Sequence, residues 1–289
     1  MKKALDPIVT VSLISPLIDF RLMPRDLVII FDVAGTILRM YRVAKDISAG
    51  CLMEKVITSD LIMEKGGRAL VVPQLDPREV PLYPPDRSIN SIFKEASMEI
   101  SCCSTPVSKE KAIEIVRTSR ARIADLQEVY RAVVAKCPSK YQTIGVIVDA
   151  DLSEISYTIS TAGTPFIGLQ EVLRQLCRTD ADVYIASGDS MRSLLCLADY
   201  GFQPDHIYPV SSPRRKRDIV VDLKQSYEMV VMVGDGMNDM QALMAADLGV
   251  LTIQQYSHPL PCLFQAADTV IKDIQELPQL IRNILGWTL

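Results

Sequence analysis

Hydrophobic and polar positions alternate with different periods along the chain, and the first informative stretch is Leu27–Phe31. This unbroken apolar run, rich in Val and Ile, is followed by Asp32 and a turn that contains Gly35. Such a run, closed by a turn, predicts a buried strand. Asp32 would then lie at the carboxyl end of a central parallel strand, where open α/β sheets bind their ligands. A buried strand followed by an ordinary Asp turn would give the same pattern, so this stretch alone does not decide the function.

A regular alternation of strand and helix patterns begins near Tyr141 and continues to the end of the chain. Short apolar runs predict strands at 143–150, 181–187, 206–210, 228–234 and 248–253. Apolar residues at three- and four-residue spacing predict helices at 168–178, 191–200, 216–225, 239–247 and 277–285. Strands alternating with helices of this length predict parallel βαβ units, with Leu27–Phe31 as the first strand of the sheet.

The intervening segment follows another pattern. β-Branched and aromatic residues continue after Thr36, and prolines between positions 73 and 85 predict an irregular connection. Ser108 then caps a long helix or a pair of helices that ends before Pro138. We therefore predict an α/β fold whose Rossmann-like parallel-sheet core comprises residues 24–40 and 141–289. A mixed α+β cap domain, residues 41–140, would be inserted into this core, and residues 1–23 would form an N-terminal extension.

Composition limits the classes of protein to consider. The 289 residues are 48% hydrophobic and 23% charged, with a net charge of −4, which is typical of a globular protein. No basic footprint for nucleic acid is present, because the cluster at 214–217 is too short to predict more than a local anion site. The apolar N-terminus resembles a weak signal peptide, but Asp6, Pro7 and Pro16 interrupt it and no cleavage site follows. No apolar stretch is long enough to predict a membrane span.

The seven cysteines are odd in number and scattered, and none forms a C-x-x-C pair, so neither a disulfide framework nor a zinc site is predicted. Adjacent Cys102 and Cys103 fit a redox-active or ligand pair, but partly buried small residues are the simpler interpretation. A reducing cytoplasm is the expected location.

Three predicted strands of the core end in polar residues. The segments are Asp32–Thr36, Ser187–Asp189 and Gly234–Asp239, and Lys216 lies between the second and the third. The sequences of these segments resemble the motifs of the haloacid dehalogenase superfamily of aspartyl-phosphate hydrolases. Residues 160–255 are most similar to the phosphorylation domain of P-type ATPases, with SGD for that group's TGD, PRRK for its P-x-x-K, and VGDGMNDMQAL for its GDGxNDxxAL. The resemblance covers about half of the chain, and the inserted segment resembles no family that we can name.

The resemblance implies phosphoryl transfer through a covalent intermediate. A carboxylate that attacks phosphorus splits one difficult displacement into two, and Asp32 is the candidate nucleophile. The site then needs a cation and fixed donors for the phosphoryl oxygens, which Lys216, Thr36, Ser187 and the loop amides near Gly35 and Gly188 would provide. The resemblance also implies Mg²⁺ as cofactor, with Asp32, Asp235 and the backbone carbonyl of Ala34 as its ligands. Asn238 and Asp239 would bind the ion through water or orient the ligands.

Ordinary structural roles compete with several of these interpretations. Lys216 belongs to a basic cluster and could be a solvated charge, and Asn238 could cap the helix that begins beside it. Other polar residues are expected to be purely structural: Asp189 as a helix cap, Asp149 and Asp151 as turn residues, and His206 and His258 in the core or at the surface.

Ala34 departs from the superfamily's usual D-x-D-x-T. The second Asp of that motif protonates the leaving group and later activates water. Such general acid–base catalysis accelerates a reaction by roughly 10²–10⁴-fold. The methyl group of Ala34 cannot transfer a proton, so this acceleration is absent here. P-type ATPases also lack this Asp. Phosphonoacetaldehyde hydrolases carry D-x-A-G-T and use a cap lysine as a Schiff base, for which Lys45, Lys55 and Lys65 are the candidates here.

We therefore expect a soluble Mg²⁺-dependent phosphohydrolase that acts on a nucleotide or another small phosphate with a good leaving group. Transport is not expected, and no membrane or nucleic-acid partner is predicted. The insert would select the substrate or bind a protein partner. Two alternatives stay open: a regulatory module that binds phosphate or nucleotide but turns over little, and an enzyme like phosphonoacetaldehyde hydrolase.

Overall fold

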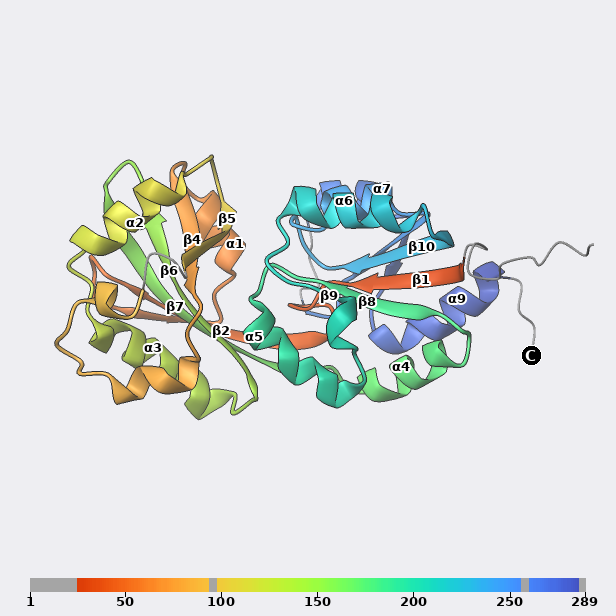
Figure 1. Cartoon of the computed structure of the whole chain (residues 1–289), viewed down its shortest axis with the longest axis horizontal. Coiled ribbons are helices and arrows are strands. Elements are labelled where there is room, and N and C mark those ends of the chain that lie inside the picture. Colours follow the sequence, from red (N-terminus) through yellow and green to blue (C-terminus); the bar gives the residue numbers. More distant parts are fainter. Residues whose placement is uncertain (1–24, 94–97, 256–259, 286–289) are drawn as a thin grey trace, which may run out of the picture.

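The computed structural model describes residues 25–93, 98–255 and 260–285. These residues form two domains, each built on a six-stranded sheet (Figure 1). The predicted N-terminal extension and His258 lie outside the described residues. Among the described helices, none is long and apolar enough to cross a bilayer.

The first domain contains a parallel sheet with strand order β12-β11-β10-β1-β8-β9. Its strands are β1 (Arg25–Phe31), β8 (Asp182–Ala186), β9 (Ile207–Tyr208), β10 (Tyr227–Gly234), β11 (Leu248–Thr252) and β12 (Thr269–Ile271). All pairs in this sheet are parallel, and β1 lies at its centre between β10 and β8. The predicted parallel-sheet core and the central position of the first strand are confirmed.

Helices cover both faces of the parallel sheet (Figure 1). They are α4 (Leu169–Cys177), α5 (Met191–Leu194), α6 (Pro213–Leu223), α7 (Met240–Ala245), α8 (Pro261–Ala266) and α9 (Leu277–Leu285), with 3₁₀ turns at Leu195–Tyr200, Pro204–His206 and Ile274–Glu276. Because side chains alternate along a strand, Leu27, Ile29 and Phe31 pack in the cluster that contains α4 and α9. Val28 and Ile30 pack against α6 and α7. This double burial explains the unbroken apolar run in β1.

The second domain contains an antiparallel sheet with strand order β3-β2-β7-β6-β4-β5. Its strands are β2 (Leu38–Asp46), β3 (Leu52–Glu54), β4 (Arg68–Pro73), β5 (Met98–Cys103), β6 (Tyr141–Asp149) and β7 (Glu154–Pro165). Its helices are α1 (Thr58–Met63), α2 (Lys109–Thr118) and α3 (Ile123–Lys136), with 3₁₀ turns at Pro77–Leu82 and Ile89–Ser91. The helix pair predicted after Ser108 is confirmed, and the Ser108 hydroxyl accepts the amide hydrogen of Lys111.

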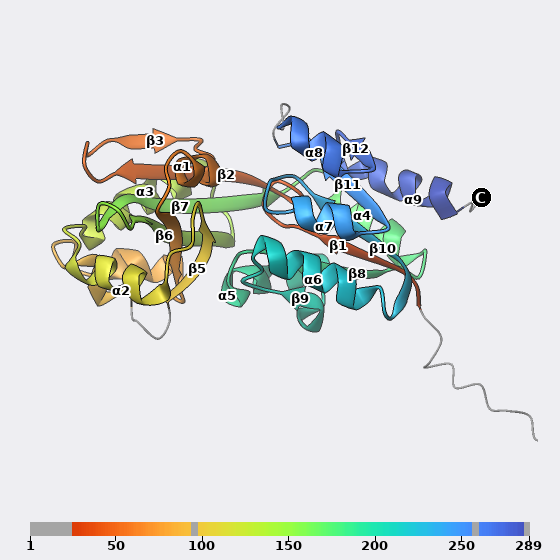
Figure 2. The ribbon, with the colours of Figure 1, turned by 90° about the horizontal axis from the view of Figure 1, so that it is seen from above.

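The boundary of the antiparallel domain differs from the prediction. Residues 141–149 and 154–165, which we assigned to the parallel core, pair with β2 and β4 in the antiparallel sheet. The domain therefore begins at Leu38 and ends at Pro165, where β2 and β7 pair and run side by side from one domain to the other (Figure 2). The reason for the error is that β6 is buried almost throughout, so it lacks the alternation expected of an antiparallel strand.

The elements predicted after residue 165 are all present, but α6 begins at Pro213 rather than at residue 216, and α8 and β12 were not predicted. The helix expected at 191–200 is α-helical only as far as Leu194 and continues as a 3₁₀ turn to Tyr200. All seven cysteines are free.

Candidate active site

Three polar segments meet at the carboxyl edge of the parallel sheet. Phe31 in β1 is in register with Val233 in β10 and with Ile185 in β8, so the residues that follow these strands emerge together. The amide of Asp32 continues the ladder by donating to the Val233 carbonyl at 2.9 Å. The parallel topology therefore brings Asp32 close to Asp235, as the sequence predicted.

The turn after β1 depends on a glycine. Gly35 has φ +88°, a left-handed conformation that L side chains rarely adopt. A methyl group at this position would lie 1.9 Å from Oδ2 of Asp235. The missing side chain of Gly35 thus lets the Asp235 carboxylate lie directly against the turn that follows the candidate nucleophile.

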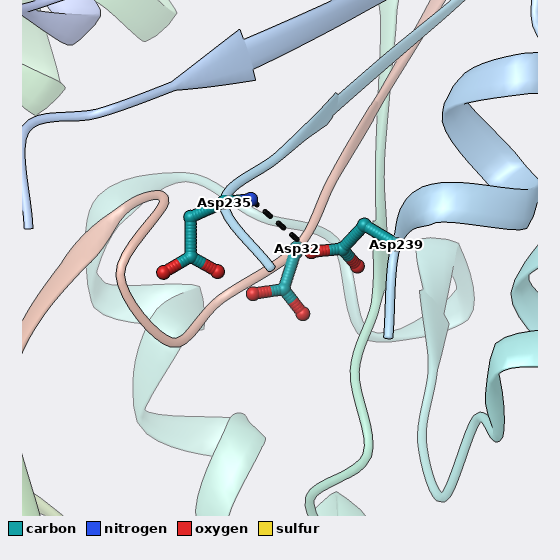
Figure 3. A group of neighbouring side chains, drawn as sticks. All are labelled: Asp32, Asp235 and Asp239. Carbon is teal, nitrogen blue, oxygen red and sulfur yellow. Dashed lines mark hydrogen bonds between the residues drawn. The ribbon is translucent and has the colours of Figure 1, made fainter. Parts of the chain in front are cut away.

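Three carboxylates converge at this edge (Figure 3). One oxygen each of Asp32, Asp235 and Asp239 lies within 4.8 Å of the other two. Oδ2 of Asp239 accepts the amide hydrogens of Asp235 at 3.1 Å and Gly236 at 3.2 Å, which fixes the loop after β10. Asp32 lies in the turn between β1 and β2, whereas Asp235 and Asp239 lie in the loop between β10 and α7, whose own hydrogen bonds hold these two together.

Lys216 is completely buried between two of these carboxylates. Its Nζ lies 2.5 Å from Oδ1 of Asp32 and 2.6 Å from Oδ1 of Asp239. Helix α6 places it there: the Ser212 hydroxyl caps the helix, and Pro213 occupies its first turn. The alternative that Lys216 is one more solvated charge is wrong, because its exposed fraction is 0%.

Burial and like charges shift the pKa values of these groups. Burial and the neighbouring Asp239 raise the pKa of Asp32 to about 7, although Lys216 acts in the opposite direction. Burial, Asp32 and Asp239 likewise raise the pKa of Asp235 well above its ordinary value. Burial opposes the charge of Lys216, but Asp239 and Asp32 outweigh it and raise the lysine pKa. Without another cation, the three carboxylates repel one another.

Among the described residues, two buried oxygens in this cluster find no hydrogen-bond partner, namely Oδ2 of Asp32 and Oγ1 of Thr36. Unpartnered buried oxygens are costly unless a ligand satisfies them. Oδ2 of Asp32 is thus available to a substrate, and the repulsion between Asp32 and Asp235 fits a hard divalent cation with oxygen ligands, such as Mg²⁺. Asp32 and Asp235 are the residues that could hold it directly, with Asp239 behind them.

The loop after β8 is arranged differently from the prediction. The Ser187 hydroxyl, which we expected to face substrate, donates to Oδ2 of Asp189 at 3.0 Å. Asp189 is not the helix cap, because the Ser190 hydroxyl accepts the amide hydrogen of Ser193 and caps α5 instead. The charge of Asp189 also contributes to the raised pKa of Asp32.

The other predicted residues have varied surroundings. Asn238 is exposed, and a methyl on Gly236 would lie 2.8 Å from its Oδ1, so its amide turns back over the loop. Ala34 is partly buried beside the turn. The ligand roles of Asn238 and of the Ala34 carbonyl stay predictions. His206 stacks on Tyr184 with ring centroids 4.1 Å apart, which confirms a structural role.

Two of the lysines considered for Schiff-base chemistry form ion pairs. Lys45 lies 2.9 Å from Asp125 and 2.6 Å from Glu128, and Lys65 lies 2.8 Å from Asp149. Burial lowers the pKa of Lys45, but the hydrogen bonds to both carboxylates outweigh it and raise the pKa above its ordinary value. A Schiff-base amine must be neutral to attack a carbonyl, so this environment does not favour Lys45. Asp149 also accepts the amide hydrogens of Asp151 and Leu152, which confirms its turn role.

Two residues of the antiparallel domain near the carboxylates were missed. The Tyr141 hydroxyl donates to Oδ2 of Asp189. Arg42 partly opposes the rise in pKa of both Asp235 and Tyr141, so its charge acts on a residue of each domain. No local motif marks either residue, because each reaches the site only through the packing of one domain against the other.

Comparisons with known proteins agree with this arrangement. A sequence model of haloacid dehalogenase-like hydrolases matches residues 27–247. A protein of Methanocaldococcus jannaschii described as a soluble P-type ATPase-like phosphatase is 31% identical over 260 residues, which cover 89% of this chain and 94% of that protein.

Similarity to transport ATPases is confined to part of their length. A probable copper-importing P-type ATPase A of Enterococcus hirae is 34% identical over 82 residues, or 28% of this chain and 11% of the transporter. Among solved structures, the catalytic domain of a CPx-ATPase, CopB-B, aligns over 89% of both chains with a TM-score of 0.46 and 18% identity.

Proposed function

The chain belongs to the haloacid dehalogenase-like hydrolases, and from this premise we propose that it is a phosphohydrolase that forms an aspartyl-phosphate at Asp32. One observation carries the proposal. Asp32 is 2% exposed, its Oδ1 is held by Lys216, and its Oδ2 has no partner. A buried carboxylate with one oxygen fixed and the other unpaired is arranged as an oriented nucleophile.

The chemistry divides into two displacements. Oδ2 of Asp32 forms a bond to phosphorus while the bond from phosphorus to the leaving-group oxygen breaks, and that oxygen leaves with the electron pair. Water then attacks the phosphorus of the aspartyl-phosphate, which releases inorganic phosphate and restores the carboxylate. Lys216 compensates the charge near the transferred group, and the unpartnered Thr36 hydroxyl is available to donate to a phosphoryl oxygen.

The donor set supports Mg²⁺ as the cofactor. Asp32 and Asp235 would hold the ion, with Asp239 fixing the Asp235 loop through the two amide hydrogen bonds. When bound, Mg²⁺ would neutralise the phosphoryl oxygens and reduce the repulsion between the carboxylates.

Ala34 limits the substrates that we propose. Its side chain cannot protonate a departing alkoxide, so the substrate needs a leaving group that is stable as an anion, such as a nucleoside diphosphate or an aryl oxide. The Methanocaldococcus relative is a soluble P-type ATPase-like phosphatase, which supports a phosphate-bearing substrate for this chain, and a nucleotide is one member of that class.

Arg42 is the residue that we propose for substrate recognition from the antiparallel domain. A methyl on Gly163 would lie 2.9 Å from Sδ of Met40 and 3.1 Å from Cδ1 of Tyr141, so these side chains share one face of the sheet. Arg42 lies two residues beyond Met40 in β2 and therefore faces the same way. Its charge acts on Asp235, which suits an anionic group of the substrate that is not transferred.

The test is the detection of an acid-stable, hydroxylamine-sensitive phosphoryl adduct after incubation with Mg²⁺ and p-nitrophenyl phosphate or ATP. We expect mass spectrometry to find it on Asp32. Asp32→Asn should abolish the adduct and lower hydrolysis by about 10³-fold or more. Asp151→Asn, which alters an exposed turn carboxylate, is the matched control and should leave both unchanged.

The same preparation distinguishes the alternatives. Hydrolysis that Asp32→Asn leaves intact would reject the nucleophile. No turnover on a broad phosphate panel, together with a melting temperature that Mg²⁺ and BeF₃⁻ still raise, would favour a regulatory binding module. Glycerol phosphate should react at least about 10²-fold more slowly than p-nitrophenyl phosphate, because only the alkyl leaving group needs a proton donor.

A further inference from the structure

The loop Ser187–Asp189 is in contact with two strands of the antiparallel domain. Oδ2 of Asp189 accepts a hydrogen bond from Tyr141 at the start of β6. The Gly188 carbonyl accepts one from the Ser101 hydroxyl of β5 at 3.1 Å. A methyl on Gly188 would lie 3.0 Å from Oγ of Ser101, so the loop approaches β5 closely.

The Tyr141 contact extends directly to Ser187. One carboxylate oxygen, Oδ2 of Asp189, accepts both the Tyr141 hydroxyl and the Ser187 hydroxyl. Oγ of Ser187 in turn accepts the amide hydrogen of Asp189 at 3.2 Å. The orientation of the Ser187 side chain is therefore set by a carboxylate that a residue of the other domain holds.

Apart from the bonds between Ser187 and Asp189 themselves, the hydrogen bonds from the described parallel domain to this loop involve its backbone. The Ser187 amide donates to the Tyr208 carbonyl at 3.1 Å, and its carbonyl accepts from Ser211 at 2.8 Å. The Asp189 carbonyl accepts the Val210 amide hydrogen at 2.9 Å. These bonds place the chain but do not determine the direction of the Asp189 carboxylate, which Tyr141 contacts.

Tyr141 is suited to hold that carboxylate. It is 2% exposed, and its ring packs in the cluster that joins β1, α4 and the start of β2. A Tyr hydroxyl buried in this way requires a hydrogen-bond partner, and a carboxylate is a strong acceptor. The ring anchors the side chain, and the hydroxyl provides one directed bond.

We propose that Tyr141 is a positioning residue of the active site, which holds Asp189 and through it fixes the Ser187 side chain and the loop after β8 at the sheet edge beside Asp32. This inference rests on the proposed phosphohydrolase function. It makes the antiparallel domain part of the catalytic apparatus rather than only a substrate selector, because the Ser187–Asp189 loop is completed only when β6 packs against it.

The principal test is Tyr141→Phe, assayed with p-nitrophenyl phosphate and Mg²⁺. We expect kcat to fall about 10–100-fold, as for other groups that orient a reacting site, while KM changes less than about 2-fold. The ring is retained, so the melting temperature should change little. Tyr157→Phe, in the same sheet but in the cluster beside α1, is the matched control and should keep full activity.

A double-mutant cycle distinguishes positioning from a general structural role. If Tyr141 acts through Ser187, then Tyr141→Phe should cost no further activity once Ser187→Ala is present. Equal losses in both backgrounds would overturn the proposal. Asp189→Asn keeps an oxygen that accepts both hydroxyls and should retain most activity, whereas Asp189→Ala should lose as much as Tyr141→Phe. Equal losses of activity in Asp189→Asn and Asp189→Ala would also overturn the proposal.

A measurement without turnover separates this inference from the proposed function. Hydrogen exchange of a peptide that covers 187–195 should become faster in Tyr141→Phe and stay unchanged in Tyr157→Phe, even if wild-type protein hydrolyses nothing. Unchanged exchange together with unchanged kcat would reject the positioning role. Absence of wild-type turnover with faster exchange would reject only the phosphohydrolase function.

Discussion

The two domains have similar architectures, but one lysine in each pairs with carboxylates in contrasting surroundings. Each is a six-stranded sheet packed with helices. In the parallel domain, Lys216 and its carboxylate partners have side-chain exposures of 0–3%. In the antiparallel domain, Lys45 pairs with carboxylates that are 18% and 41% exposed. Removing charges from water is costly, and a buried pair offsets that cost only with good geometry and further hydrogen bonds.

The difference shows that the unfavourable electrostatic interactions of the proposed active site lie in the parallel domain. The parallel domain keeps like charges together at one strand edge, with a carboxylate oxygen and a hydroxyl left unpaired. Such arrangements persist only where the surrounding structure imposes them, and they are common at functional sites. The antiparallel domain instead contributes single directed groups, the Tyr141 hydroxyl and the Arg42 charge, to the cluster that the other domain holds.

The largest expected effect comes from removing the same positive charge in each domain. Lys216→Met leaves the buried carboxylates of Asp32 and Asp239 uncompensated, so we expect the free energy of unfolding in EDTA to fall by about 3–5 kcal/mol. Lys45→Met breaks a pair that water partly solvates and should cost about 1 kcal/mol or less. Urea unfolding followed by circular dichroism measures both. Equal losses would mean that the two lysines have equivalent surroundings and would break the comparison.

A smaller effect is expected from the same backbone change in both domains. Gly35 and Gly50 both have left-handed φ angles, +88° and +69°, so an alanine at either strains the backbone by about 1–2 kcal/mol. A methyl on Gly50 would meet no atom of the described residues within 4 Å, whereas at Gly35 it would overlap Oδ2 of Asp235. Gly35→Ala should therefore also displace Asp235 and weaken Mg²⁺ binding about 10–100-fold.

Isothermal titration calorimetry with Mg²⁺ provides the measurement. Gly50→Ala is the control for backbone strain and should bind Mg²⁺ like the wild type. An unchanged Mg²⁺ affinity in Gly35→Ala would show that Asp235 can move without weakening Mg²⁺ binding. Asp235 would then not be a ligand of the ion.

The sequence predicted more of the parallel domain than of the antiparallel one, for a physical reason. In the parallel domain, strands buried on both faces alternate with amphipathic helices, and each element is recognisable alone. Strand β6 is also buried on nearly its whole length, so its composition resembles that of a parallel strand and its true partners were not evident. Pairing of β6 with β7 and β4 is a non-local property that periodicity does not encode.

The same limit applies to the active site. Asp32, Lys216, Asp235 and Asp239 follow strand ends or a helix start within motifs, so their convergence could be inferred from topology. Asp189 was expected to be a helix cap because its local sequence offers that role. Instead, its carboxylate accepts the hydroxyls of Ser187 and of Tyr141, which lies 48 residues away in the other domain, and the Tyr141 bond forms only because the domains pack together.

The smallest expected effect concerns pH in the absence of metal. Burial and Asp239 raise the pKa of Asp32 in the folded protein to about 7 from an ordinary value of 3.8, and that of Asp235 is also raised. The folded state therefore binds protons that the unfolded state has released. The stability from this protonation is fully present below about pH 4 and is lost as pH rises through about 7. Between pH 6 and pH 8, metal-free protein should become less stable.

We expect the melting temperature in EDTA to fall between pH 6 and pH 8, by roughly 2–4 °C for each kcal/mol by which the free energy of unfolding decreases. The fall should be smaller in Asp32→Asn. Mg²⁺ should raise the melting temperature more at pH 8, where the carboxylates that bind it are ionised, than at pH 6. Lys216 titrates above this range and adds no slope of its own. A wild-type melting temperature in EDTA that stays level or rises toward pH 8 would mean that Lys216 keeps Asp32 ionised throughout. The parallel domain would then hold its buried charges as stably as the antiparallel domain holds its solvated pairs.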